Sequence, residues 1–349
     1  MSASQTACGG AATGRLRRMT RCGSKRRARA SRTGGSPEEP LRNICGLAIM
    51  RPSYDRARGG SMPRSLEGQS AIVTGAALGL GNAFARALAG EGANVTVCDV
   101  RDEVNDLVPA LEASGVQAQA FVADVGVVED VRRVVDGHVE SFGGVDVLVS
   151  NAGVWRASTA TDDLDKTLDD YDFVVNTNLK GVFLFGRAVI PHMIAGGGGN
   201  IVHISSDHIA TCGTPYRRGC DEAPDCVWRD QGPRPTGGGP DMDLYDASKW
   251  GINGFTIPWS KALREHNVRV NGLCMGATDS HMVRTFHEQN PDSGILVNAM
   301  RAEDVAALMI ELVNEGPEGR TGNNINIAVG HPIELPPPGS LYIYSEATA

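Results

Sequence analysis

The chain has 349 residues, of which 41% are hydrophobic and 21% are charged, and this composition excludes wholesale disorder. Its net charge of −8 is uneven, because residues 1–61 hold 13 Lys and Arg against three Asp and Glu. The acidic remainder argues against nucleic acid as a partner, since phosphates bind Lys and Arg. No apolar run approaches about 18 residues, so we expect no membrane span. Eight Cys without paired spacings predict reduced thiols in a cytoplasmic protein.

Residues 1–61 form a basic segment that is rich in Arg, Ser, Gly and Ala and has no hydrophobic period. Three interpretations are open. The segment is a transit-like or nucleic-acid-binding tail, a disordered extension, or upstream sequence that is absent from the protein because translation starts at Met62. We favour the last two, because Met62 directly precedes the first globular pattern.

From residue 69 onward, short apolar runs alternate with segments of helical spacing. We expect strands at 70–75, 94–100, 116–125, 145–153, 200–206, 268–274 and 323–329. We expect helices at 82–92, 104–115, 128–143, about 163–194 with a break near Gly181, 245–266 and 302–316. This alternation predicts parallel strands joined by right-handed crossovers. Residues 62–349 are therefore expected to form a single, doubly wound α/β domain.

The turn after the first expected strand is rich in glycine, with the sequence TGAALGLG from Thr74 to Gly81. Glycines allow a tight turn and a close approach to a pyrophosphate, and the following helix offers free N–H groups. Asp99 ends the second strand, where a carboxylate hydrogen-bonds a ribose 2′-OH and repels a 2′-phosphate. Leu78 brings no positive charge. These residues predict NAD, rather than NADP, as the cofactor.

A candidate acid/base pair lies on the helix before the sixth strand. Of six Tyr, only Tyr245 has a Lys four residues later, at Lys249, so the two side chains share a helix face. A free Tyr has a pKa of about 10, and a nearby ammonium lowers it. We expect Lys249 to lower the pKa of Tyr245 enough for proton transfer with an alcohol.

In order along the chain, these motifs resemble the classical short-chain dehydrogenase/reductase family over nearly all of residues 69–331. The glycine turn resembles TGxxxGxG, Asn151-Ala152-Gly153 resembles the NAG motif, and Tyr245 with Lys249 resembles YxxxK. The resemblance implies a Rossmann-type sheet in three layers, α/β/α, and a homodimer or homotetramer. It also implies an oxidoreductase that transfers hydride between a secondary alcohol or ketone and NAD.

The resemblance assigns roles to individual residues. Tyr245 is the general acid/base, Lys249 also binds the nicotinamide ribose, and Asn178 holds a water in the proton relay. Ser206 hydrogen-bonds the substrate oxygen, with Ser205 as the less favoured alternative. The implied cofactor site comprises Thr74, Gly75, Ala77, Leu78, Gly79, Leu80, Gly81, Asp99, Val100, Asp124, Val125, Asn151, Ala152, Gly153, Tyr245, Lys249, Gly276, Thr278 and Ser280.

The chain departs from the family pattern between Ser206 and Tyr245. This interval includes an insertion at about 211–240, in which 11 of 30 residues are Gly or Pro. We interpret it as a lid or specificity loop beside the substrate pocket, with a plain surface insertion as the alternative. Its three Cys lack the spacing of a compact zinc site, so we expect no metal.

Candidate substrate contacts are Ser206, His208, Trp155 and His281. A mixed aromatic and polar wall suits a cyclic or bulky alcohol, whereas the Arg217-Arg218 pair favours an acidic one, and the sequence leaves both open. The alternative to an enzyme is a non-catalytic NAD-binding sensor or scaffold on the same fold. An intact Ser, Tyr, Lys and Asn set argues against that alternative, because binding alone does not need the Tyr.

Overall fold

The computed structural model describes residues 65–209, 241–297, 299–327, 329 and 333–335, and all of these belong to the unit Gly60–Ala349. The basic segment 1–61 and the insertion 211–240 lie outside the described residues.

Seven strands form a single, parallel sheet in the order β3-β2-β1-β4-β5-β6-β7. The strands are β1 (Ser70–Thr74), β2 (Asn94–Asp99), β3 (Ala118–Val122), β4 (Val147–Ser150), β5 (Gly199–Ser206), β6 (Val268–Met275) and β7 (Asn324–Ile327). In the central strand β1, Val73 pairs with Val97 of β2 on one side and with Val149 of β4 on the other. The chain reverses its direction of winding between β1 and β4, which is where a doubly wound sheet opens a crevice for ligands.

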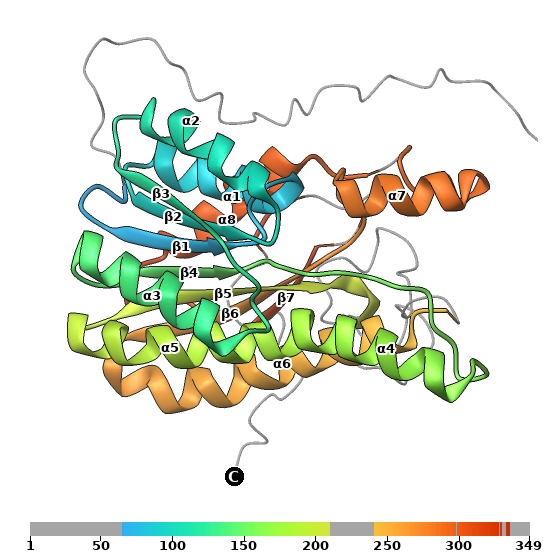
Figure 1. Ribbon diagram of the computed structural model, residues 1–349. Helices are drawn as coiled ribbons and strands as arrows, with labels where there is room; N and C mark the ends of the chain where they lie inside the picture. Colours follow the sequence, from blue (N-terminus) through green and yellow to red (C-terminus); the bar gives the residue numbers. More distant parts are fainter. Residues whose placement is uncertain (1–64, 210–240, 298, 328, 330–332, 336–349) are drawn as a thin grey trace, which may run out of the picture. The chain divides into compact units, whose positions relative to one another are not determined.

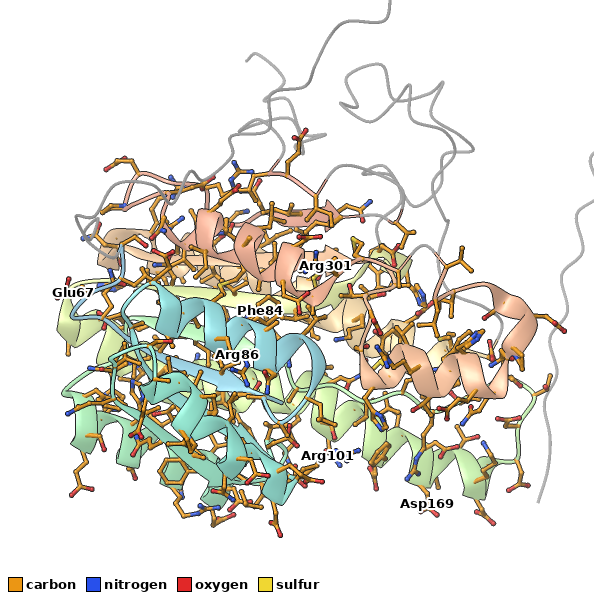
Figure 2. The ribbon with its side chains drawn as sticks, turned by 90° about the horizontal axis from the view of Figure 1, so that it is seen from above. Glu67, Phe84, Arg86, Arg101, Asp169 and Arg301 are labelled. Atoms are coloured by element: carbon orange, nitrogen blue, oxygen red, sulfur yellow. The ribbon has the colours of Figure 1, made fainter. Side chains whose placement is uncertain are left out.

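Helices cover both faces of the sheet, as Figure 1 shows. One face carries α1 (Gly79–Gly90), α2 (Val108–Glu112) and α8 (Ala302–Val313). The other face carries α3 (Val128–Phe142), α5 (Gly181–Gly196) and α6 (Asp243–Leu263). Phe84 of α1, labelled in Figure 2, is fully buried against the sheet, while Arg86 lies two residues on at the exposed surface. The predicted three-layer, doubly wound fold is therefore confirmed.

The long helical stretch after β4 differs from the expectation of a break at Gly181. Helix α4 (Leu164–Val175) continues through one π-helical turn, η2 (Asn176–Lys180), directly into α5. The chain keeps helical dihedral angles at both junctions, so Gly181 begins α5 instead of ending a helix. A Cβ at Gly181 would lie 2.6 Å from Val125 Cγ2, so this glycine is required for close packing and not for a break.

The joined helix Leu164–Gly196 is also long and apolar enough, with a mean hydropathy of 1.2, to satisfy the length and composition of a membrane span. Core helices of α/β domains satisfy the same criteria. Here the α5 half packs against α3 and against strands β4 and β5. Its apolar character is thus accounted for by the layer that it forms over the sheet.

Three other elements differ from the sequence expectation. The helix expected at 104–115 is a 3₁₀ turn, η1 (Asp102–Leu107), followed by the short α2. An unexpected helix, α7 (His281–Gln289), follows β6, and Ser280 caps it by accepting a hydrogen bond from Val283 N. Pro258 lies inside α6, which continues through it to Leu263.

A buried imidazole ties α3 to the sheet. His138 is fully buried, its Nδ1 lies 2.7 Å from Thr96 Oγ1 on β2, and its Nε2 lies 3.2 Å from Ser70 Oγ on β1. Burial lowers the pKa of His138 to about 4, because a charged imidazole would lose its hydration there. The folded state therefore favours the neutral ring.

We expect this group to make the fold sensitive to acid. A folded pKa below the unfolded value of about 6.5 gives a contribution that is complete above pH 6.5 and is lost as the pH falls towards about 4. In the wild type, protonation of His138 should account for up to about 3 kcal/mol of the fall in the free energy of unfolding at acid pH. His138→Gln lacks this group, so its free energy of unfolding should fall by that much less. Urea unfolding at several pH values measures this, with His266→Gln on the surface as the matched control. An unchanged decrease in His138→Gln would contradict the assignment.

Candidate active site

A cavity of about 890 Å³ opens at the carboxyl ends of the central strands. Its wall is formed by the loops after β1, β2, β3, β4, β5 and β6, together with parts of α4, η2, α6 and α7. The predicted site residues that line it are Gly75, Leu78, Gly79, Leu80, Asp99, Val100, Asp124, Val125, Asn151, Ala152, Gly153, Trp155, Tyr245, Lys249, Gly276, Thr278, Ser280 and His281. The predicted residues Thr74, Ala77, Gly81, Asn178, Ser206 and His208 are not in this lining, although several contact residues that are.

The glycine-rich turn is packed too tightly for a side chain at Gly75 or at Gly81. Gly75 and Gly79 have φ of +65° and +57°, a region that favours glycine. A Cβ at Gly75 would lie 2.6 Å from Ala152 Cα, and one at Gly81 would lie 2.1 Å from Gly75 O. Helix α1 begins here with no side-chain cap, so its first N–H groups are available to a ligand at the cavity.

Hydrogen bonds fix this turn to the segment after β4. Thr74 Oγ1 accepts from the backbone N–H groups of Asn151 and Ala152, each at 3.0 Å. Asn151 Nδ2 donates to Thr74 O at 3.0 Å and to Gly75 O at 2.9 Å. Thr74 and Asn151 therefore hold the ends of β1 and β4 together at the crevice, and their role is to shape the cavity floor.

Asp99 lies at the end of β2 beside the same turn. Its Oδ2 accepts from Ala77 N at 3.0 Å, and its Oδ1 accepts from Arg101 N at 3.1 Å. These bonds orient the carboxylate while leaving lone pairs for a further donor. On the next strand, Asp124 Oδ1 accepts from Gly126 N at 2.8 Å, which shapes the loop after β3 in the same way.

Ser206, Tyr245 and Lys249 meet where β5 and α6 approach each other. A hydrogen bond joins the side chains of Tyr245 and Ser206. Lys249 Nζ donates to Ile204 O at 2.9 Å and lies 5.6 Å from the centre of the Tyr245 ring. The alternative residue, Ser205, donates its hydroxyl to Lys249 O at 3.2 Å, so that hydroxyl is engaged with the helix backbone.

The pKa of Tyr245 differs from the expectation. Burial raises it to about 12, and the hydrogen bond with Ser206 acts in the opposite direction. Burial also lowers the pKa of Lys249 to about 8, because the ammonium is removed from water. The expectation that Lys249 lowers the pKa of Tyr245 is therefore wrong for the protein alone, because burial of the phenol raises that pKa instead.

Asn178 lies in the π-helical turn and is fully buried. Its side-chain Oδ1 accepts from Val154 N at 2.7 Å, and its Nδ2 donates to Val154 O at 2.9 Å and to Ser248 Oγ at 3.0 Å. The side-chain amide is thus fully used in joining η2 to the loop after β4 and to α6. A Cβ at Gly153 would lie 3.4 Å from Lys249 Nζ and 3.5 Å from Asn178 Oδ1, so Lys249 and Asn178 both lie beside Gly153.

The segment after β6 closes the other side of the cavity. Thr278 Oγ1 donates to Gly276 O at 3.1 Å, which holds the turn after β6. The Cβ of Ser280 would lie only 3.2 Å from a Cβ at Gly79, so the start of α7 contacts the glycine-rich turn. The hydroxyl of Ser280 caps α7 as an acceptor and keeps its own proton to donate.

Of the predicted substrate contacts, Trp155 and His281 line the cavity, whereas Ser206 and His208 do not, and the ring of His208 lies edge to face with that of Tyr245. Phe286 of α7 meets Trp155 edge to face, with ring centres 5.4 Å apart. Trp155 Nε1 is buried and has no hydrogen-bond partner among the described residues. Arg101 after β2, which the sequence suggests is a solvated surface charge, also lines the cavity. Sequence reasoning missed Phe173 of α4, because only the folded arrangement brings it to the cavity.

The described residues contain no group of three or more His, Cys, Asp or Glu arranged to hold a metal ion. In contrast, the glycine cradle, the uncapped start of α1 and the carboxylate of Asp99 all lie along the cavity. These are the features with which a doubly wound sheet binds a dinucleotide. The donor set and the space therefore fit a dinucleotide cofactor.

The comparisons with known proteins agree with this geometry. A family model described as short chain dehydrogenase matches residues 69–214 and 236–291. The chain is 30% identical over 270 residues to the 3-oxoacyl-[acyl-carrier-protein] reductase FabG of Thermotoga maritima, covering 76% of this chain and 98% of that protein. Among solved structures, it is similar to a short chain dehydrogenase from Burkholderia cenocepacia in complex with NADP (31% identity, TM-score 0.60, 76% and 98% of the two chains). It is also similar to one from Mycobacterium paratuberculosis bound to NAD (27% identity, TM-score 0.60, 77% and 98%).

The tight packing at Gly81 gives a test of the cradle. Gly81→Ala should lower the affinity for NAD and NADP alike by at least about tenfold, because the new Cβ displaces the turn at Gly75 O. Isothermal titration calorimetry measures both affinities. Gly90→Ala at the far end of α1, where a Cβ meets nothing within 4 Å, is the matched control and should bind normally. Equal affinities in the two variants would contradict the cradle.

Proposed function

The chain belongs to the short-chain dehydrogenase family, and on this basis we propose that it is an NAD-dependent oxidoreductase acting on a secondary alcohol or its ketone. The observation that carries the proposal is that Tyr245 and Lys249 line a cavity whose other end is a glycine cradle, with Ser206 directly against Tyr245. The runner-up, a non-catalytic NAD-binding sensor, needs the cradle but has no use for the Tyr245 and Ser206 pair.

The dinucleotide would lie along the cavity, with its pyrophosphate at the start of α1 and a ribose at Asp99. Lys249, Thr278 and Ser280 would hold the nicotinamide end, and Asp124 with Val125 the adenine. When bound, the cofactor accepts a hydride from the carbinol carbon in one direction and supplies it in the other.

The protein's own residues handle the proton. Ser206 donates a hydrogen bond to the substrate oxygen, and Tyr245 Oη takes the hydroxyl proton during oxidation or returns it during reduction. Lys249, with a pKa lowered to about 8, provides a cation beside the phenol that favours its ionised form. Asn178 holds the π-helical turn, and thereby the loop after β4, in the position that a proton relay through water requires.

We propose NAD as the preferred form because of the charge at the ribose end of the cavity. Asp99 is fixed there by two backbone N–H groups, and a 2′-phosphate beside it would meet a like charge. Arg101 lines the same region and is the feature that acts in the opposite sense. The similar solved structures include one with NAD and one with NADP, so the choice is specific to the residues of each chain.

A cyclic or otherwise bulky secondary alcohol suits the substrate end. Trp155 and Phe286 form an aromatic wall, and Met282 with Val283 of α7 adds apolar surface. The unpartnered Nε1 of Trp155 offers one hydrogen bond for a polar group remote from the reacting carbon.

We further propose that the chain forms a homodimer or homotetramer in the cytoplasm and binds neither nucleic acid nor a membrane. Large apolar side chains are exposed on the three helices α4, α5 and α6. These are Leu164, Leu168, Tyr171, Phe183, Trp250 and Ile257. An exposed apolar face of this kind is typical of an interface.

Tyr245→Phe should reduce kcat by about 10²- to 10⁴-fold and leave NAD affinity nearly unchanged, because the aromatic ring stays and only the proton carrier is lost. The measurement is steady-state formation of reduced nicotinamide with a panel comprising cyclohexanol, borneol, a 3-hydroxysteroid and a 2-hydroxy acid. Tyr171→Phe, at the exposed tyrosine of α4, is the matched control. Turnover retained in Tyr245→Phe would refute the acid/base role.

Asp99→Asn should raise the affinity for NADP relative to NAD by about tenfold, because the amide keeps the shape and loses the negative charge. Calorimetric titration of both nucleotides gives the ratio. Asp102→Asn, an exposed neighbour three residues along, should leave the ratio as it is. If Asp99→Asn also left it unchanged, the carboxylate would not select the cofactor.

A further inference from the structure

A third residue connects Ser206 to the helix that carries Tyr245. The backbone N–H of His208 donates to Ser206 Oγ at 3.2 Å, and the imidazole Nδ1 lies 2.9 Å from Asp246 Oδ1. Asp246 is the residue next to Tyr245 on α6. His208 therefore contacts one member of the Ser206 and Tyr245 pair through its backbone and the neighbour of the other through its side chain.

The imidazole also lies directly against the phenol. The rings of His208 and Tyr245 meet edge to face, with centres 5.7 Å apart. The side chain of His208 is 27% exposed, and that of Asp246 is 23% exposed, so the ion pair is shielded but in reach of solvent protons. The general acid/base chemistry described above makes no use of this pair.

Several charged groups surround His208. From the short helix η3 (Asp207–Ile209) comes Asp207, which is buried and whose Oδ2 would lie 2.8 Å from a Cβ at Gly276. Helix α6 contributes Asp246, Tyr245 and Lys249. Strand β6 contributes Cys274, whose thiol pKa is raised by burial and also by the charge of Asp207. The cluster thus places two carboxylates and one imidazole near Tyr245, and none of the three lines the cavity.

We propose that His208 is a positioning residue, which holds Ser206 against Tyr245 and, through its ion pair with Asp246, sets the charge beside the phenol. The inference rests on the proposed oxidoreductase function, since it concerns the proton transfer at that site. It assigns to His208 a role that acts through Ser206 and Tyr245, in place of the direct substrate contact that the sequence suggested.

The direction of the effect follows from the charges. Burial acts to lower the pKa of His208, but the hydrogen bond and charge of Asp246, with the charge of Asp207, raise it above its ordinary value. Asp207 and Asp246 each raise the pKa of Tyr245. An imidazolium at His208 offsets part of this negative charge and so favours the phenolate, whereas a neutral ring does not.

The test is the pH profile of kcat/KM for alcohol oxidation, which rises as Tyr245 ionises. His208→Gln keeps a hydrogen-bond donor for Asp246 but loses the charge, so it should move the apparent pKa of the profile upward by about one unit. Asp246→Asn added to His208→Gln removes one of the two carboxylates that raise the pKa of Tyr245 and should return the apparent pKa towards the wild-type value. If His208 had a purely structural role, both variants would have lower rates, but the apparent pKa of the profile would not rise in the single variant and return in the double variant.

A measurement without substrate separates this proposal from the proposed function. Histidine NMR titration, assigned with His208→Gln, should give a pKa for His208 above its ordinary value in the wild type and a lower one in Asp246→Asn. A His208 that titrates alike in both proteins overturns the proposal, as does an unshifted pH profile in His208→Gln. Absence of turnover with every alcohol would instead overturn the oxidoreductase function, and the NMR titration would still decide whether the ion pair controls the charge at His208.

Discussion

The hydrogen bonds between Thr74 and Asn151 are the constraint on which the rest of the site depends. They join the carboxyl ends of β1 and β4, the two strands at which the winding of the sheet reverses. Because the two segments approach so closely, no Cβ fits at Gly75 or Gly81, and the turn must be built from glycine. The start of α1 is thereby directed into the crevice, and the loop after β4 is placed within reach of Asn178 and Lys249.

Around this fixed point the site is a balance between burial and charge. Burial raises the pKa of Tyr245 to about 12, which favours the protonated phenol. It lowers the pKa of Lys249 to about 8, which makes the neutral amine easier to form. Charged groups from two segments surround the phenol. Lys249 Nζ lies 5.6 Å from the ring centre, the ring of His208 lies edge to face with it, and Asp207 and Asp246 raise its pKa. The protonation of Tyr245 therefore depends on groups outside the motif that identifies it.

The sequence was sufficient for the order of the elements, because each strand is an apolar run that ends in a turn signal and each long helix has a clear period. It also predicted that the glycine turn, Asp99 and Asn151 lie together, since all three follow strands that end at one edge, and they do line one cavity. Local patterns could not reveal the π-helical turn at Asn178, which depends on packing against Val154 and Ser248. The helix α7 was missed because none of its residues is fully buried.

The sign of the pKa shift at Tyr245 was wrong for a related reason. Spacing shows that Lys249 shares a helix face with Tyr245, but it gives no measure of how far the phenol is withdrawn from water. Likewise, His208 and Asp246 are 38 residues apart in the chain, and only the return of α6 to the end of β5 brings them to hydrogen-bonding distance. Interactions between distant segments decide electrostatics, whereas motifs decide mainly which side chains are present.

The central claim is that this cavity transfers hydride between a carbinol carbon and a bound nicotinamide. The most direct test uses cyclohexanol deuterated at the carbinol carbon, with NAD, and follows the label by NMR. The account predicts that deuterium appears on the nicotinamide ring in proportion to the cyclohexanone formed, on one face only. NAD that binds tightly while no label is transferred from cyclohexanol or from any other deuterated alcohol would contradict it.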